Sequence, residues 1–152
     1  MLSGASILTL EEVVPTQRQA EELYSQLEAR RYNISHSVLP DYENHIKFLN
    51  NNPYRAWFLI KVATKFVGNI YVQFDNSIGL HCNCDIPELH IKAVLDSLLQ
   101  RLAPLEVVPS ARSKNYFLNV ASSNLELQKK LINIGLTESQ RSFIFAKKQG
   151  DS

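Results

Sequence analysis

The amino-acid sequence predicts an α+β fold in which helices pack on one sheet. Segments with helical periodicity lie in both halves of the chain. Between them, three extended segments follow one another with only short turns, over 56–63, 66–74 and 78–84. A length of 152 residues suits one compact domain better than two. We therefore expect residues 1–152 to form a single domain with a polar tail over about 147–152.

Charge and composition argue against several classes of function. The 16 basic and 15 acidic residues leave a net charge of +1, so we expect no nucleic-acid partner. Apolar runs stay far below the roughly 20 residues that span a bilayer, and the first residues lack the basic flank of a signal peptide. Only Cys82 and Cys84 are available as thiols, which favours a cytoplasmic protein without disulfides.

The first third of the chain predicts one strand and two helices. Residues 7–10 are of β type, and a helical pattern begins after Pro15 and continues to about Arg31. A second helix is expected over 42–49, and the asparagines before Pro53 end it.

The three extended segments in the middle are rich in β-branched and aromatic residues. Thr64-Lys65 and Asn76-Ser77 are short enough to be hairpin turns, so these segments predict an antiparallel meander. A helix then starts at Pro87, where the missing N–H of proline costs nothing. Its broad apolar face, which reaches Leu102, is expected to pack on the sheet.

The last third predicts a loop, two strands and one helix. Residues 104–115 form a loop that crosses the sheet, and residues 116–120 form a strand that is a candidate for full burial. Asn124 is expected to cap a helix that ends at Gly135. Residues 142–146 are predicted to form the final strand.

This order of elements resembles the GNAT superfamily of acyl-CoA-dependent N-acetyltransferases across nearly the whole chain. Residues 54–60 and 66–72 look like the family's second and third strands, with its "x-x-G-x-I" step at Gly68. Leu118 to Asn124, followed by Gly135 eleven positions later, is similar to the family's strand and "N-x-x-A-x-x-x-Y-x-x-x-G-F" motif. The resemblance implies a mixed, strongly twisted sheet flanked by helices on both faces.

The resemblance also implies a site for acetyl-coenzyme A. In the family the fourth and fifth strands splay apart and the pantetheine arm lies in the gap. The pyrophosphate sits at the N-terminus of the next helix, where free N–H groups favour anions. By resemblance, the cofactor-binding residues are Cys82, Asn83 and Cys84 for the arm, Leu89, His90, Ile91, Lys92 and Ala93 for the pyrophosphate, and Asn124 for the far wall.

Two features depart from the family pattern. Leu89 and Ile91 stand where the phosphate-binding turn usually has glycine, and side chains there crowd the oxygens. Against this, helix N–H groups bind anions whatever the side chain, and His90 and Lys92 add positive charge. Leu131 stands at the position of the tyrosine that protonates the departing thiolate, so that acid is missing.

Candidates for the base and for the acceptor pocket follow from the same resemblance. His81, beside the proposed pantetheine strand, is the first candidate base because imidazole titrates near neutral pH. His36 and His45 come next and Glu88 after them, and an ordinary packed or surface side chain is the alternative for each. The segment that shapes the acceptor pocket in similar proteins contributes Tyr32, His36 and Tyr42.

Other residues of reactive type have simpler explanations. His81, Cys82 and Cys84 are metal-ligand types, but on a strand the cysteines share one face and the histidine points to the other, so we expect no metal site. Arg112 and Lys114 either meet the adenosine 3′-phosphate or are solvated.

The sequence thus favours an acyltransferase that moves an acetyl or other acyl group from acyl-CoA to a primary amine of a small molecule or peptide. The alternative is a catalytically inactive fold that serves as a binding or protein-interaction module. A homodimer is compatible with both, since dimers are common in similar proteins. A chain that works only as a subunit of an assembly would expose an apolar patch.

Overall fold

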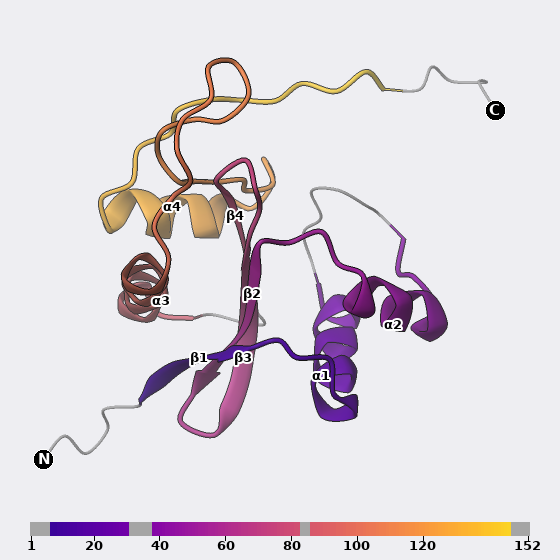
Figure 1. Ribbon diagram of the computed structural model, residues 1–152. Helices are drawn as coiled ribbons and strands as arrows, with labels where there is room; N and C mark the ends of the chain where they lie inside the picture. The colour runs from indigo at the N-terminus through magenta and orange to yellow at the C-terminus, as the bar shows by residue number, and fades with distance from the viewer. Residues whose placement is uncertain (1–6, 31–37, 83–85, 147–152) are drawn as a thin grey trace, which may run out of the picture.

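The computed structural model describes residues 7–30, 38–82 and 86–146, and Figure 1 shows their arrangement. A central sheet has α1 and α2 on one face and α3 and α4 on the other (Figure 1). None of the helices in the described ranges is long and apolar enough to cross a membrane. The elements in chain order are β1 (Leu8–Glu12), α1 (Gln17–Glu28), α2 (Tyr42–Asn50), β2 (Ala56–Val62), β3 (Lys65–Val72), β4 (Ser77–Cys82), α3 (Glu88–Arg101), β5 (Phe117–Leu118) and α4 (Leu125–Asn133).

The sheet is mixed, as predicted. Its five strands lie in the order β1-β2-β3-β4-β5, antiparallel from β1 to β4 and parallel between β4 and β5. The predicted meander is confirmed, with β2 to β4 joined by short turns. Parallel pairing of β4 with β5 follows because α3 and the 103–116 segment carry the chain back across the sheet.

Alternation of side chains along the strands gives each face its own core. The face toward α3 and α4 carries the larger core, in which Phe58, Ile60, Ile70, Val72 and Leu80 of the sheet pack with Ile91, Val94, Leu98 and Leu131 of the helices. The face toward α1 and α2 carries a smaller core of Ala20, Leu23, Leu49 and Leu59. The apolar stripe of α3 is buried on the sheet, as its sequence pattern predicted.

Side-chain caps are found at the start of α2 and α4, and a glycine follows the end of α4. Asn124 caps α4 by accepting a hydrogen bond from the Leu127 N–H, as predicted, at 3.2 Å. Gly135 follows α4 with φ of +108°, which also confirms the prediction, because L-residues with a side chain rarely adopt that angle. Asp41 caps α2 by accepting from the Asn44 N–H at 2.8 Å. This aspartate was not among the predicted caps.

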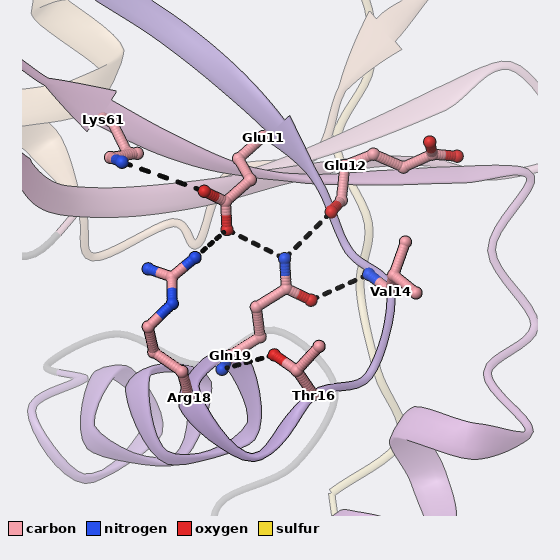
Figure 2. A network of polar contacts seen from close by, with 7 residues as sticks. All are labelled: Glu11, Glu12, Val14, Thr16, Arg18, Gln19 and Lys61. Carbon is pink, nitrogen blue, oxygen red and sulfur yellow. Dashed lines mark hydrogen bonds and ion pairs between the residues drawn. The ribbon is translucent and has the colours of Figure 1, made fainter.

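A buried glutamine joins β1 to the start of α1 (Figure 2). The Gln19 amide donates to Glu11 Oε2 at 2.8 Å and to the Glu12 carbonyl at 3.0 Å, and its oxygen accepts from the Val14 N–H at 2.7 Å. Arg18 also donates to Glu11 at 3.0 Å. The hydrogen bond from Gln19 and the Arg18 guanidinium hold the pKa of the Glu11 carboxyl below its usual value.

A second buried amide fixes the turn between β3 and β4. Asn76 is fully buried, and its side-chain nitrogen donates to the carbonyls of Leu105 and Ser113, both at 2.9 Å. Its side-chain oxygen accepts from the Leu105 N–H at 2.9 Å. The Phe117 N–H donates to the Asn76 carbonyl at 3.2 Å, so this one residue positions both the crossing segment and the start of β5.

Several boundaries differ from the predictions. Residues 142–146 form no strand, because a strand needs a hydrogen-bonded neighbour and none of the described strands pairs with them. Strand β5 covers only Phe117–Leu118 instead of 116–120 and is half-buried. Helix α1 ends at Glu28, before the expected end near Arg31. Predictions for Tyr32, His36, Asn83, Cys84 and 147–152 lie outside the described residues.

We expect Asn76→Ala to lower the free energy of unfolding by about 2–4 kcal/mol, because it leaves two carbonyls and one N–H without partners and places alanine at φ of 71°. Urea denaturation monitored by tryptophan fluorescence measures the change. Asn50→Ala, at an exposed helix end, is the matched control with an expected effect below about 1 kcal/mol. Equal stability of the two variants would contradict this role for Asn76.

Candidate functional site

Strand β4 separates from β5 after two residue pairs. Ser77 pairs with Phe117 and Ile78 with Leu118, and the Asn119 N–H reaches the Ile78 carbonyl at 3.4 Å. Beyond that point β4 continues to Cys82, still paired with β3 on its other edge. Within the described ranges no strand covers the β5 side of residues 79–82. Next to Leu80, this edge offers backbone groups that no described strand uses to an extended ligand that carries amide groups.

Helix α3 starts close in the chain to the end of this open edge. Pro87 is its N-cap in an extended conformation, with φ of −61° and ψ of 147°, and provides no side-chain cap. Leu89 is 76% exposed, whereas Ile91 is fully buried in the core beneath the sheet. Neither of the two residues at the expected glycine positions therefore plugs the helix start, since one extends into solvent and the other into the core.

Side chains of α4 pack on the first turn of α3. The Lys130 Nζ donates to the Ile86 carbonyl at 2.9 Å and pairs with Glu126 at 3.3 Å. The Asn133 amide donates to Glu88 Oε1 at 2.7 Å. Glu88 thus adds negative charge at the helix start, while Lys130 adds positive charge nearby. Neither of these α4 residues was among the predicted site residues, although their spacing of three places them on one helix face.

The charge expected from Lys92 is already paired. Its Nζ lies 2.8 Å from Asp96 Oδ2, four residues along the same exposed face of α3. His90 and Ala93 are half-buried on the helix. The backbone N–H groups of His90 and Ile91 donate to the Pro87 carbonyl, at 2.9 and 3.1 Å. In this structure, therefore, neither these two N–H groups nor a free lysine is available to an anion.

On the opposite face of the sheet, His81 lies in a group of aromatic side chains. It stands opposite Asn69 in the β3–β4 register, and its ring centroid is 5.8 Å from that of Tyr71. Tyr71 stacks on Tyr54, with centroids 4.0 Å apart and an interplanar angle of 10°. Trp57 meets Tyr54 edge-on at 4.9 Å. Cys82, the next residue of β4, packs toward the larger core on the other face.

A chain of hydrogen bonds fixes these side chains to α1. The Trp57 indole N–H donates to Asn69 Oδ1 at 3.0 Å, and the Asn69 amide donates to Gln26 Oε1 at 2.8 Å. Gln26 in turn donates to Glu22 at 2.8 Å. Both Asn69 and Gln26 are buried, so the face that carries His81 is held by satisfied polar groups as well as by packing.

Arg30, just after α1, carries a charge that pairs with none of the acidic residues in the described ranges. Burial lowers the pKa of Arg30, and its Nε is buried without a hydrogen-bond partner among the described residues. Its charge acts on Tyr71 and Tyr54, whose pKa values burial raises, so both phenols stay neutral near pH 7.

His45 occupies a different place. It is 3% exposed, and its Nε2 lies 3.0 Å from the Ala20 carbonyl of α1. The rings of Tyr24 and Tyr42 lie 5.1 and 6.0 Å away. Burial lowers the pKa of His45, so the neutral imidazole joins α2 to α1. Tyr42 is 40% exposed and lines a depression of about 210 Å³ between these helices.

The candidate bases are therefore distributed over different elements. His81 lies on β4, with its ring beside Tyr71 on the face that α1 and α2 cover. His45 lies between α1 and α2, and Glu88 lies at the start of α3, the helix that packs on the other face. Asn124, predicted to contact the cofactor, uses its oxygen to cap α4. Leu131, at the tyrosine position, is buried in the core. In the part of the chain that the structure describes, no group of three possible metal ligands converges.

We expect Gly68→Ala to displace the end of β4, because a Cβ there would lie 2.1 Å from the His81 carbonyl oxygen. The expected loss of unfolding free energy is about 1–3 kcal/mol, with a shift of the His81 ring signals in NMR spectra. Gly135→Ala is the control, since its Cβ would meet nothing within 4 Å and its strain stays at the end of α4. Unchanged His81 signals in Gly68→Ala would contradict the close approach.

No protein-family model matches the sequence, and a search of curated proteins gives no significant match. Solved structures do match. An acetyltransferase from Thermus thermophilus superposes with a TM-score of 0.61 at 16% identity, covering 96% of this chain and 92% of that one. The aminoglycoside N-acetyltransferase AAC(6')-Iy, in complex with CoA, gives 0.62 at 11% identity, with 94% and 96% covered.

The N-acetyltransferase PseH of Campylobacter jejuni gives a TM-score of 0.59 at 14% identity, with coverage of 89% and 91%, and a complex of PseH with acetyl-coenzyme A also matches. These likenesses extend over nearly the whole of each chain. The chain therefore has the α+β fold of the GNAT acetyltransferases, as its sequence predicted.

Proposed function

We propose that the protein transfers an acetyl or other acyl group from acyl-coenzyme A to a primary amine. The observation that carries this proposal is the separation of β4 from β5 after Ile78, beside the start of α3. The pantetheine arm would lie beside Cys82, Asn83 and Cys84, and the pyrophosphate against the start of α3, over 89–93. Acetyl-CoA would serve as acyl donor, and the protein would act as a single cytoplasmic domain.

In the proposed mechanism, the amine of the acceptor attacks the thioester directly. Backbone N–H groups near Cys82 would polarise the thioester carbonyl, which becomes more negative as the new C–N bond forms. His81, or a water that it orients, would take the proton from the amine. Since Leu131 offers no proton, the thiolate would leave without a protein acid. This is feasible because a thiol is a good leaving group and positioning supplies much of the rate.

Arg30 indicates which amines to expect. Similar structures include a spermidine N-acetyltransferase and an aminoglycoside acetyltransferase bound to sisomicin, and both of these named molecules are cations with several amines. A desolvated guanidinium close enough to act on Tyr71, whose ring in turn lies beside that of His81, would repel such cations. We therefore propose an acceptor that carries a carboxylate or another anionic group near its amine, as small amino acids and peptides do.

The second candidate function is a binding module that has lost acyl-CoA chemistry. The observation in its favour is the carboxylate of Glu88 at the start of α3, in a turn without glycine. A negative charge at this position opposes a bound pyrophosphate. The two candidates differ in whether acyl-CoA binds at all, so a binding measurement separates them.

Calorimetric titration with acetyl-CoA should give a micromolar Kd if the helix start holds pyrophosphate. Leu89→Glu adds a second carboxylate beside the phosphates and should weaken binding about tenfold or more. Leu99→Glu, at another exposed position of α3, is the matched control and should bind as the wild type does. Absence of binding at millimolar acetyl-CoA would leave only the second candidate function.

An acceptor screen with a free-thiol readout should favour carboxylate-bearing amines. With the acceptor that reacts best, Arg30→Gln should raise the KM for that acceptor about 10- to 100-fold without changing the Kd for acetyl-CoA, because it removes a charge-assisted contact.

His81→Gln should lower kcat and abolish the rise in rate that accompanies deprotonation of the imidazole. Lys47→Gln, an exposed position on α2, is the control. A preference for polyamines would contradict the role of Arg30.

A further inference from the structure

The phenol of Tyr71 covers the backbone of β4 at the point where that strand separates from β5. Gly79 is the first residue of β4 beyond its last pair with β5, and it stands opposite Tyr71 in the β3–β4 register. A Cβ at Gly79 would lie 2.1 Å from Tyr71 Cζ and 2.4 Å from the Tyr71 hydroxyl oxygen. The end of the phenol therefore fills the space that a side chain at position 79 would occupy, and it reaches from β3 over β4.

Neighbouring aromatic rings hold this phenol in place. Tyr71 stacks on Tyr54 with ring centroids 4.0 Å apart and an interplanar angle of 10°. Tyr54 in turn meets Trp57 edge-on at 4.9 Å. The ring of His81, two residues after Gly79 in β4, lies 5.8 Å from that of Tyr71. Because rotation of Tyr71 away from Gly79 would break the stack on Tyr54, the ring forms a fixed wall over this part of β4.

Aliphatic side chains close the other face of the sheet at the same point. Ile78 and Leu80 flank Gly79 in β4 and are only 3% and 5% exposed. Both belong to the larger core, in which Leu131 of α4 is buried and against which Leu118 of β5 packs. The pair of Ile78 with Leu118 joins the two strands just before Gly79. A ligand group that approaches Gly79 along β4 therefore meets the phenol on one face, the core on the other and paired strands ahead.

We propose that Tyr71 restricts the acyl donor to acetyl-CoA, because its ring occupies the space that a longer acyl chain would need. This inference rests on the proposed function, which places the pantetheine arm beside residues 82–84 and the pyrophosphate at the start of α3. In the chain, β4 leads from Gly79 toward α3. An arm that begins at the helix start and follows β4 backwards would therefore direct its acyl end toward Gly79.

Close packing around Gly79 opposes a longer acyl chain. Each added methylene would have to displace the Tyr71 ring from its stack on Tyr54 or push into the core. Protein interiors are close-packed, so added volume forces neighbouring side chains out of their preferred positions. One methylene in an enclosed apolar pocket changes discrimination by roughly 10- to 200-fold. Butyryl-CoA, whose acyl chain is longer than acetyl by two methylenes, is therefore a suitable probe.

Calorimetric titration with CoA, acetyl-CoA and butyryl-CoA tests this restriction without an acceptor. In the wild type, the Kd for butyryl-CoA should exceed that for acetyl-CoA about tenfold or more. Tyr71→Val should reduce this ratio to about threefold or less, because it removes the ring over Gly79. Tyr71→Phe keeps the ring and should preserve the wild-type ratio. Phe66→Val, which removes another ring packed on the smaller core, should preserve it as well.

Titration with CoA also shows whether each variant is folded and binds. If Tyr71→Val fails to bind CoA, Tyr71→Leu, which retains more of the packing, takes its place and should show the same loss of discrimination. Equal binding of acetyl-CoA and butyryl-CoA by the wild type would overturn the inference and leave the proposed function standing. An unchanged ratio in Tyr71→Val or Tyr71→Leu would have the same meaning. A wild type that binds none of the three ligands would instead overturn the proposed function, and this inference with it.

Discussion

The register of the β2–β3–β4 meander is the constraint on which the rest of the structure depends. It places the larger apolar core on the face toward α3 and α4 and places Trp57, Tyr71 and His81 on the other. A slip of one residue would exchange the two sets of side chains. Two glycines in the meander allow neighbouring backbone and side-chain atoms to approach closely in this register. A Cβ at Gly68 would meet the His81 carbonyl, and a Cβ at Gly79 would lie 2.1 Å from the Tyr71 ring.

Polar contacts, more than apolar packing, position α1 on this sheet. Gln19 and Gln26 are both buried, seven residues apart on one helix. Gln19 bonds to Glu11 and the backbone near β1, and Gln26 bonds to Asn69 of β3. A buried amide that loses its hydrogen-bond partner destabilises the folded protein. These bonds therefore specify the orientation of α1 more sharply than apolar contact does. That orientation also places Arg30, just after α1, where its charge acts on Tyr71 and Tyr54.

Local signals in the sequence predicted the features that depend on neighbouring residues. The meander, the cap at Asn124 and the left-handed Gly135 follow from propensity, short turns and steric freedom, and the structure confirms them. The hydrogen bond from Asn69 to Gln26 and the one from Lys130 to Ile86 join residues more than 40 positions apart, which no local pattern encodes. The same reason explains residues 142–146, whose β-type composition specifies a strand only when another strand pairs with it.

The start of α3 shows how the loss of glycine can be compatible with anion binding. A glycine turn lets backbone approach phosphate, but the N–H groups that bind the anion do not depend on side chains. Here Leu89 is in solvent and Ile91 is in the core, so neither takes the place of the anion. The remaining opposition is electrostatic and comes from Glu88, whose carboxylate Asn133 holds without neutralising it. Lys130 lies nearby, bonded to the Ile86 carbonyl in the preceding turn, but its charge is already paired with Glu126 at 3.3 Å. Electrostatic repulsion, rather than the side chains of Leu89 and Ile91, is therefore what an anion at this helix start would have to overcome.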